Sequence, residues 1–159
     1  MLKLYHGSNV VIDKIDLSFG HINKDFGKGF YLTSIYRQAQ AMAERKARQY
    51  ANAKAVVTTF LFDDDCLGSN ELNVKIFNEV SEEWALFILQ IRKASRINFK
   101  HDFDIVIGPV ADDGVTQHLD LYEMGLIGLP QLIEGLRYRE LNNQYYFGTD
   151  RAVAKLKKI

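Results

Sequence analysis

Phe26-Gly27-Lys28-Gly29-Phe30-Tyr31-Leu32-Thr33 is the stretch of sequence that sets the expected fold. Its second half, residues 29–33, is a short aromatic run that is typical of a strand. The glycines and polar residues over 18–28 follow neither a helical nor a strand period, so they predict an exposed loop before that strand. Ser34 is expected to cap a helix that continues through Arg48, because apolar residues recur there at helical spacing.

Strands and helices alternate irregularly along the rest of the chain. No glycine-rich strand-to-helix turn of the dinucleotide-binding kind occurs, so the pattern predicts an α+β fold rather than a doubly wound parallel sheet. Clusters of β-branched and aromatic residues predict further strands at residues 2–5, 55–62, 71–77, 103–110 and 141–148. Apolar periodicity and capping signals predict further helices from residue 81 to at least 91, and at residues 114–125, 130–138 and 151–158.

Composition predicts one domain, residues 1–159, because 47% of the residues are apolar and can bury a core without metals or disulfides. Cys66 is the only cysteine, so no intramolecular disulfide can form. The first residues lack a signal peptide, and no apolar run approaches the roughly 18 residues of a membrane span, so we expect a cytoplasmic protein. The balanced charge argues against tight, sequence-independent binding to nucleic acid.

Three segments carry residues suited to binding a ligand: Tyr5-His6-Gly7-Ser8, the stretch at residues 26–33, and Asn142-Asn143-Gln144-Tyr145-Tyr146-Phe147. Their order and spacing resemble the ADP-ribosyltransferase superfamily, in the branch with a His-Tyr-Glu pattern that diphtheria-type toxins share with poly-ADP-ribose polymerases. Over nearly its whole length the chain looks like a bacterial family of small ADP-ribosyltransferase-like proteins of unknown function that carry Gln at the third position. The resemblance implies a split, mixed β-sheet core of two sheets with peripheral helices, and NAD in the cleft between the sheets.

The resemblance also assigns residues. His6 matches the histidine that bonds a ribose hydroxyl of NAD, and Gly7 matches the position whose backbone holds the nicotinamide carboxamide. Tyr31 matches the tyrosine that stacks on the nicotinamide ring. Gln144 matches the catalytic position, usually Glu, that engages the nicotinamide-side ribose. The expected catalytic residues are therefore His6, Tyr31 and Gln144, and the expected NAD-binding residues are His6, Gly7 and Tyr31.

The chemistry of these residue types agrees with those roles. An aromatic face such as Tyr31 attracts the flat nicotinamide cation. A glycine such as Gly7 allows close approach of the backbone to a ligand. Cleavage of the ribose–nicotinamide bond builds positive charge on the ribose, which a carboxylate would stabilise. Gln144 has no charge, and replacing a carboxylate by a dipole is expected to lower the rate by about 10²–10³.

The expected function is NAD-dependent mono-ADP-ribosyl transfer, with the toxin of a toxin–antitoxin pair as one setting. The acceptor is left open among protein, nucleic acid, a small molecule and water, and an antitoxin protein is a candidate partner. One rival is a non-catalytic module that binds NAD or ADP-ribose, and another is an NAD glycohydrolase. A third is an interaction protein that uses its helices near residues 114–138.

Other candidate residues point to less specific roles. The sequence predicts no metal site, because His6, His21, His101, His118 and Cys66 show no paired ligand spacing. Asp63-Asp64-Asp65 lacks the spacing of a calcium loop and is expected to be a solvated turn. Asp112 and Asp113 either line the cleft or cap the following helix. Gly27-Lys28-Gly29 is not a phosphate loop, since it lies in no strand-to-helix context.

Overall fold

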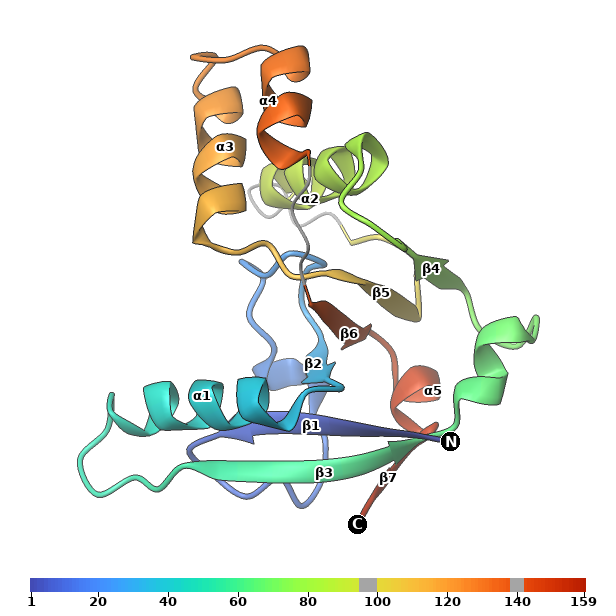
Figure 1. Ribbon diagram of the computed structural model, residues 1–159. Helices are drawn as coiled ribbons and strands as arrows, with labels where there is room; N and C mark the ends of the chain where they lie inside the picture. The colour runs from blue at the N-terminus through green and yellow to red at the C-terminus, as the bar shows by residue number, and fades with distance from the viewer. Residues whose placement is uncertain (95–99, 138–141) are drawn as a thin grey trace.

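The computed structural model describes residues 1–94, 100–137 and 142–159, and these form an α+β fold around one mixed sheet. The sheet curls like half of a barrel (Figure 1), and its strands in the described residues follow the order β4-β5-β6-β2-β1-β3-β7. β4 and β5 are parallel, and the other neighbours are antiparallel. The strands are β1 (Leu2–Ser8), β2 (Phe30–Thr33), β3 (Val56–Phe62), β4 (Val74–Ile76), β5 (Ile105–Pro109), β6 (Asn143–Phe147) and β7 (Leu156–Lys158).

The junction between β1 and β2 is the shortest strand pairing in this sheet. β1 pairs with β3 along its whole length, and β2 pairs with β6 along its whole length. Between β1 and β2 the register gives a single pair, Tyr5 opposite Thr33. The predicted division into two sheets is therefore wrong, because this pair keeps one continuous sheet. Beyond Tyr5, however, β1 and β2 are no longer paired.

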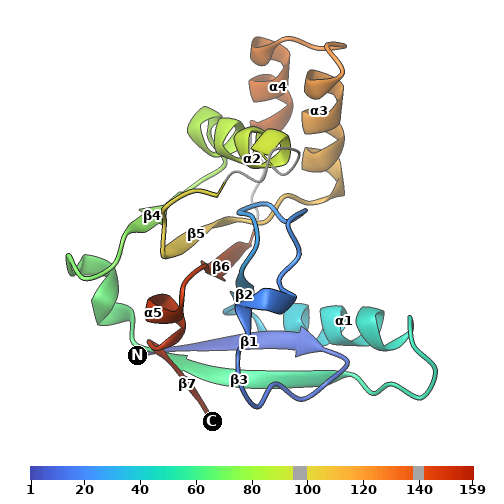
Figure 2. The ribbon, with the colours of Figure 1, turned by 180° about the vertical axis from the view of Figure 1, so that it is seen from behind.

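Helices lie at both ends of the curled sheet. Figures 1 and 2 show α2, α3 and α4 gathered at one end of the molecule, beyond β5, and α1 lying alongside β1 and β3. The helices of the described residues are α1 (Tyr36–Ala47), α2 (Glu82–Ala94), α3 (Asp113–Glu123), α4 (Leu129–Leu136) and α5 (Asp150–Val153). Short 3₁₀ turns occupy Leu17–Phe19 and Asp64–Gly68.

Two hydrophobic clusters cover the two faces of β5 and β6. Val106 and Tyr146 belong to the cluster formed with α2, α3 and α4, whereas Ile105 and Phe147 belong to the cluster formed with β1 and β3. Neighbouring residues of a strand point to opposite faces, so both faces of these strands are covered. This explains why β5 is buried at every position from Ile105 to Pro109.

The first strand is longer than its sequence predicts. The composition of His6-Gly7-Ser8 suggests a turn-rich exit after Tyr5, but β1 continues to Ser8, which lies opposite Val56 of β3. Hydrogen bonding to β3, which is rich in β-branched and aromatic residues, outweighs the weak propensity of glycine and serine for β structure. His6 and Gly7 are consequently held in a sheet rather than in a loop.

The C-terminal segment also differs from its predicted form. A helix over residues 151–158 is wrong, because α5 ends at Val153 and β7 follows. β7 pairs with the outer edge of β3, where Leu156 lies opposite Phe62. The pairing satisfies backbone groups of β3 that would otherwise lack a strand partner on that side.

The start of α1 shows a further correction. Its N-cap is Ile35, which makes no side-chain capping bond, so the predicted cap at Ser34 is wrong. The hydroxyl of Thr33 instead accepts a hydrogen bond from the Ile35 N–H at 3.1 Å. Residue 138 of the predicted fourth helix and residue 141 of the predicted sixth strand lie outside the described residues.

Gly7 allows α1 to lie directly against β1. A Cβ atom at this position would stand 2.0 Å from the carbonyl oxygen of Ala39 on α1. No side chain fits at such a distance unless the helix moves away from the strand. The glycine therefore has a packing role that is independent of any ligand.

We expect Gly7→Ala to lower the free energy of unfolding by about 1–3 kcal/mol, because overpacking at a backbone contact forces the helix outward. Urea unfolding followed by circular dichroism measures this change. Gly68→Ala is the matched control, since a Cβ there would meet no heavy atom within 4 Å. Equal unfolding free energies for the two variants would contradict this account of the α1–β1 contact.

Candidate functional site

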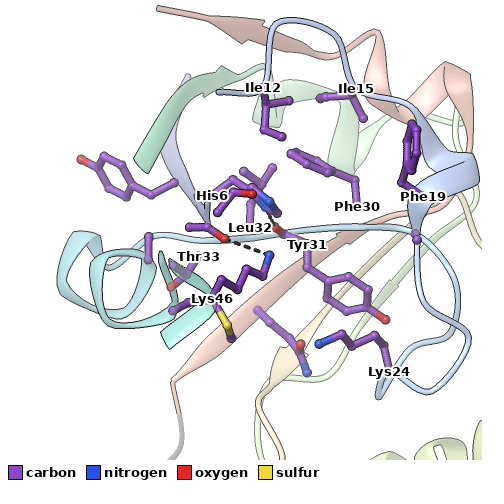
Figure 3. A pocket seen from close by; sticks show the side chains of 18 of the residues that line it. His6, Ile12, Ile15, Phe19, Lys24, Phe30, Tyr31, Leu32, Thr33 and Lys46 are labelled. Carbon is purple, nitrogen blue, oxygen red and sulfur yellow. Dashed lines mark hydrogen bonds between the residues drawn. The ribbon is translucent and has the colours of Figure 1, made fainter. Parts of the chain in front are cut away.

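A cavity of about 620 Å³ lies where β1 and β2 diverge. Its walls come from β1, β2, α1, the loop of residues 9–29, and the facing residues Val110 and Gln144. His6, Gly7, Tyr31 and Gln144 all line it, so the structure brings the four sequence-predicted residues together. Figure 3 shows His6, Tyr31, Lys24 and Lys46 around this cavity. Its size falls in the usual range for sites that bind small molecules.

His6, which lines the cavity, has one ring nitrogen that can accept a hydrogen bond. Its Nδ1 bonds the carbonyl oxygen of Tyr31 at 2.8 Å, and its ring stacks on Phe30 with centroids 4.5 Å apart. A carbonyl can only accept, so Nδ1 carries the proton and Nε2 carries the lone pair of the neutral ring. Burial lowers the pKa of His6 to about 4, and the nearby Lys46 and Lys24 charges act in the same direction. His6 is therefore neutral at pH 7.

Tyr31 contributes its ring to the cavity while its hydroxyl holds the preceding turn. The hydroxyl donates to the carbonyl oxygen of Gly27 at 2.7 Å and accepts from the N–H of Phe26 at 3.1 Å. Its ring meets Tyr146 edge-on, with centroids 5.4 Å apart. Burial raises the pKa of Tyr31 well above its usual value, so the phenol keeps its proton.

Two more buried side chains hold the same turn, which we call the 26–28 turn. His101 accepts from the N–H of Phe103 at 3.1 Å through Nδ1, so its Nε2 carries the proton that it donates to the Phe26 carbonyl at 2.8 Å. The hydroxyl of Tyr146 donates to the Lys28 carbonyl at 3.1 Å. Gly27 adopts a φ of 87°, which side chains rarely tolerate, so this turn requires its glycine.

The carbonyl of Gly7 has a partner that sequence reasoning did not anticipate. Lys46 donates to it from Nζ at 3.0 Å, and burial lowers the pKa of this lysine. A carbonyl oxygen has two lone pairs, so Gly7 can still accept a second bond from a ligand. The signal was present in the sequence, because Lys46 follows Ala39 and Met42 at helical spacing on the face of α1 that lines the cavity.

Gln144 is bonded to a carboxylate. Its Nε2 donates to Asp25 Oδ2 at 2.7 Å and, more weakly, to the Pro109 carbonyl oxygen at 3.4 Å. The same Asp25 oxygen accepts from the N–H of Ala111 at 3.1 Å. Sequence reasoning missed Asp25, which is half-buried although it belongs to a segment predicted as an exposed loop. No spacing signal could have found it, because 119 positions separate it from Gln144.

The cavity combines positive charge with an apolar rim. Lys14, Lys24 and Lys46 line it, and so does the exposed ring of Phe19. The long 9–29 loop that carries most of these groups is tied to the sheet at Asp13, which pairs with Lys158 of β7 at 2.8 Å. This arrangement suits an anionic ligand that also carries flat apolar groups.

The other sequence candidates have structural roles. Asp112 is the N-cap of α3, where its carboxylate accepts from the N–H of Val115 at 2.8 Å, and it does not line the cavity. Asp113 lies in the first turn of the same helix. Asp64 and Asp65 begin a 3₁₀ turn. Within residues 1–94, 100–137 and 142–159, no group of three His, Cys, Asp or Glu side chains could hold a metal ion.

The sequence matches one family model over residues 2–158, and its description is "Protein of unknown function (DUF3990)". The chain belongs to this family. The family description assigns no activity and states no relation to ADP-ribosyltransferases. Neither the curated proteins nor the solved structures gave a match to this DUF3990 member. In the part of the chain that the structure describes, no helix is long and apolar enough to cross a membrane.

We expect the stability of this DUF3990 protein to fall between about pH 6.5 and pH 4. Its His6 has a folded pKa of about 4, below the ordinary 6.5, so the unfolded chain takes up a proton first as the pH falls. The stabilisation is therefore complete above pH 6.5 and is lost through this window, by at most about 3 kcal/mol. The lowered pKa of His101 acts in the same direction.

His6→Asn separates the contribution of His6 from that of other groups. The asparagine amide can still donate to the Tyr31 carbonyl from nearly the place of Nδ1, but it does not titrate. Urea unfolding at pH 7.0 and pH 5.0 should show a smaller loss of stability for this variant than for the wild type. Parallel pH dependences for the two proteins would show that His6 is not buried as described.

Proposed function

We propose that this protein binds NAD in the cavity between β1 and β2 and transfers a single ADP-ribose unit from it to an acceptor. One observation carries the proposal. Three segments far apart in the sequence supply His6, Gly7, Tyr31 and Gln144, which are the positions that the resemblance to ADP-ribosyltransferases assigns to NAD, and all four line one cavity.

The character of the cavity supports NAD as the ligand. The NAD diphosphate is an anion, and Lys14, Lys24 and Lys46 offer positive charge along the cavity walls. The Tyr31 ring offers an aromatic face for the nicotinamide cation. Neutral His6 accepts at Nε2, so the matching ligand group is a donor such as a ribose hydroxyl. These three kinds of contact correspond to the three parts of NAD.

The proposed reaction breaks the bond between ribose C1 and the nicotinamide nitrogen. The electron pair of that bond stays on the nitrogen, so nicotinamide leaves as a neutral molecule and positive charge develops on the ribose. An oxygen or nitrogen of the acceptor then bonds to C1, and its proton passes to solvent. The acceptor is a protein, a nucleic acid, a small molecule or, in NAD hydrolysis, water.

The resemblance to toxins suggests a biological setting. We propose a cytoplasmic protein that acts as the toxin of a toxin–antitoxin pair, so that an antitoxin protein would be its partner. The alternative function is a non-catalytic module that binds NAD or ADP-ribose, and the neutral side chain of Gln144 favours it. Release of nicotinamide distinguishes the two, because a binding module retains NAD intact.

We expect the purified protein to bind NAD in calorimetry and to release nicotinamide when incubated with it. With NAD labelled in its adenylate half and a bacterial lysate, the label should move to one fraction of the lysate, which identifies the acceptor class. Label found only in free ADP-ribose would identify an NAD glycohydrolase. Binding of NAD without release of nicotinamide would identify a non-catalytic binding module. If the protein does not bind NAD at all, the proposal is overturned.

Tyr31→Ala should weaken NAD binding by tenfold or more, which corresponds to about 1.4 kcal/mol, because it removes the stacking face. Tyr31→Phe should weaken binding less, but it should lower the free energy of unfolding by about 1 kcal/mol, because the 26–28 turn loses its hydroxyl partner. Calorimetry with NAD and urea unfolding measure the two effects.

Tyr36→Ala is the matched control for Tyr31→Ala. Tyr36 also meets a tyrosine, Tyr5, edge-on with centroids 5.4 Å apart, but it does not line the cavity. Its replacement should leave NAD affinity unchanged. If Tyr31→Ala and Tyr36→Ala bind NAD as tightly as the wild type, the nicotinamide does not stack on Tyr31.

A further inference from the structure

The amide of Gln144 has only one chemically sensible orientation. Its Nε2 faces the Asp25 carboxylate and the Pro109 carbonyl, and both of these groups can only accept hydrogen bonds when the carboxyl is ionised. A flipped amide would place its oxygen against two other oxygens. Both N–H groups of Gln144 therefore point to this pair of acceptors, and the carbonyl oxygen Oε1 remains for a ligand in the cavity that Gln144 lines.

Asp25 is itself held firmly in place. Its Oδ2 accepts from the N–H of Ala111, which follows β5, in addition to the bond from Gln144. The neighbouring 26–28 turn, fixed by Tyr31, His101 and Tyr146, sets where the chain places Asp25. A carboxylate fixed from two sides is suited to orient another group.

We propose that Asp25 is a positioning residue, which fixes the Gln144 amide and supplies beside it the negative charge that the usual Glu of the resembled superfamily carries. This inference rests on the proposed function. A carboxylate that accepts from an amide N–H draws electron density toward the amide oxygen, so Oε1 becomes a stronger acceptor. The charge of Asp25 thus reaches the reacting ribose through Gln144, without direct contact.

Other charged groups surround this pair. Lys24 precedes Asp25 in the chain, and the Tyr31 phenol on β2 lies close enough to interact with it electrostatically. Asp25 and Lys24 also line a second cavity, together with Arg92 of α2 and with Asp120 and Glu123 of α3. Arg92 bonds Asp120 at 2.8 Å and Glu123 at 3.5 Å. Their charges are the same in every variant below, so differences between variants report on positions 25 and 144.

Moving the charge between the two positions tests the proposal. Asp25→Asn keeps an oxygen for the Ala111 N–H but removes the charge. Gln144→Glu places a second carboxyl against Asp25, and since two carboxylates at such a distance resist joint ionisation, the introduced carboxyl keeps its proton to higher pH. The double variant Asp25→Asn, Gln144→Glu leaves one charge, now at position 144. Its asparagine amide donates to that carboxylate and gives up the bond from the Ala111 N–H, because both bonds meet Asp25 at the same oxygen. Asp65→Asn, which removes one carboxylate at an exposed position outside the cavity, is the control.

The test is to measure NAD affinity by calorimetry, and nicotinamide release from pH 5 to pH 9, for these variants and the wild type. Asp25→Asn should lower kcat by about tenfold or more with less than a threefold change in NAD affinity, because the charge acts on the transition state. Gln144→Glu should gain activity as the pH rises. The double variant should recover at least the wild-type kcat and lack that rise, and Asp65→Asn should match the wild type.

Each other outcome is informative. If the wild type does not bind NAD, the proposed function falls and this inference falls with it. If the wild type binds and cleaves NAD but Asp25→Asn keeps its kcat, the proposed function stands and the role of Asp25 is overturned. If neither variant that carries Asp25→Asn folds, Gln144→Glu decides, because an activity that does not rise with pH would show that the introduced carboxyl does not interact with Asp25.

Discussion

The hydroxyl of Tyr31 makes the contact on which the rest of the site depends. It donates to Gly27 and accepts from Phe26, so both of its hydrogen-bonding functions are satisfied where water has little access. Leaving such a group unpaired would cost about 1–3 kcal/mol. The bonds fix the 26–28 turn, the turn fixes the approach of Lys24 and Asp25, and the ring of the same residue lines the cavity. One side chain therefore couples the shape of the loop to the surface offered to a ligand.

The cavity exists because β1 and β2 stop pairing beyond one position. Backbone groups at such a junction lose their strand partners and need others. Two side chains supply them, since His6 of β1 bonds the Tyr31 carbonyl and Lys46 of α1 bonds the Gly7 carbonyl. In both cases a polar side chain takes the place of a backbone partner at the edge of the cavity. The residues that bond these unpaired carbonyls are thus the same residues that a ligand in the cavity would meet.

Much of this arrangement is predictable from sequence, within clear physical limits. Local patterns predicted β2, β3 and α3, because these elements follow their own periodicity and caps. The predicted residues His6, Tyr31 and Gln144 do line one cavity. Apart from the predicted cap at Ser34, the failures depend on distant partners. β3 extends β1 to Ser8 and converts the predicted last helix into β7, and the half-buried position of Asp25 depends on Gln144 and Ala111, far along the chain.

The pairing of Asp25 with Gln144 also gives a physical reason for the glutamine. Two ionised carboxylates in contact repel each other, and in a half-buried site this repulsion is poorly screened. A chain that holds Asp25 against position 144 is therefore more stable with a neutral donor there, and an amide is the neutral group of the same length as Glu that can donate to a carboxylate. The glutamine need not mean that the site lacks negative charge. In this structure the negative charge lies on Asp25, one hydrogen bond farther from the cavity than a carboxylate at position 144 would be. Asp25 is a loop residue, and Tyr31 holds it in place through the 26–28 turn.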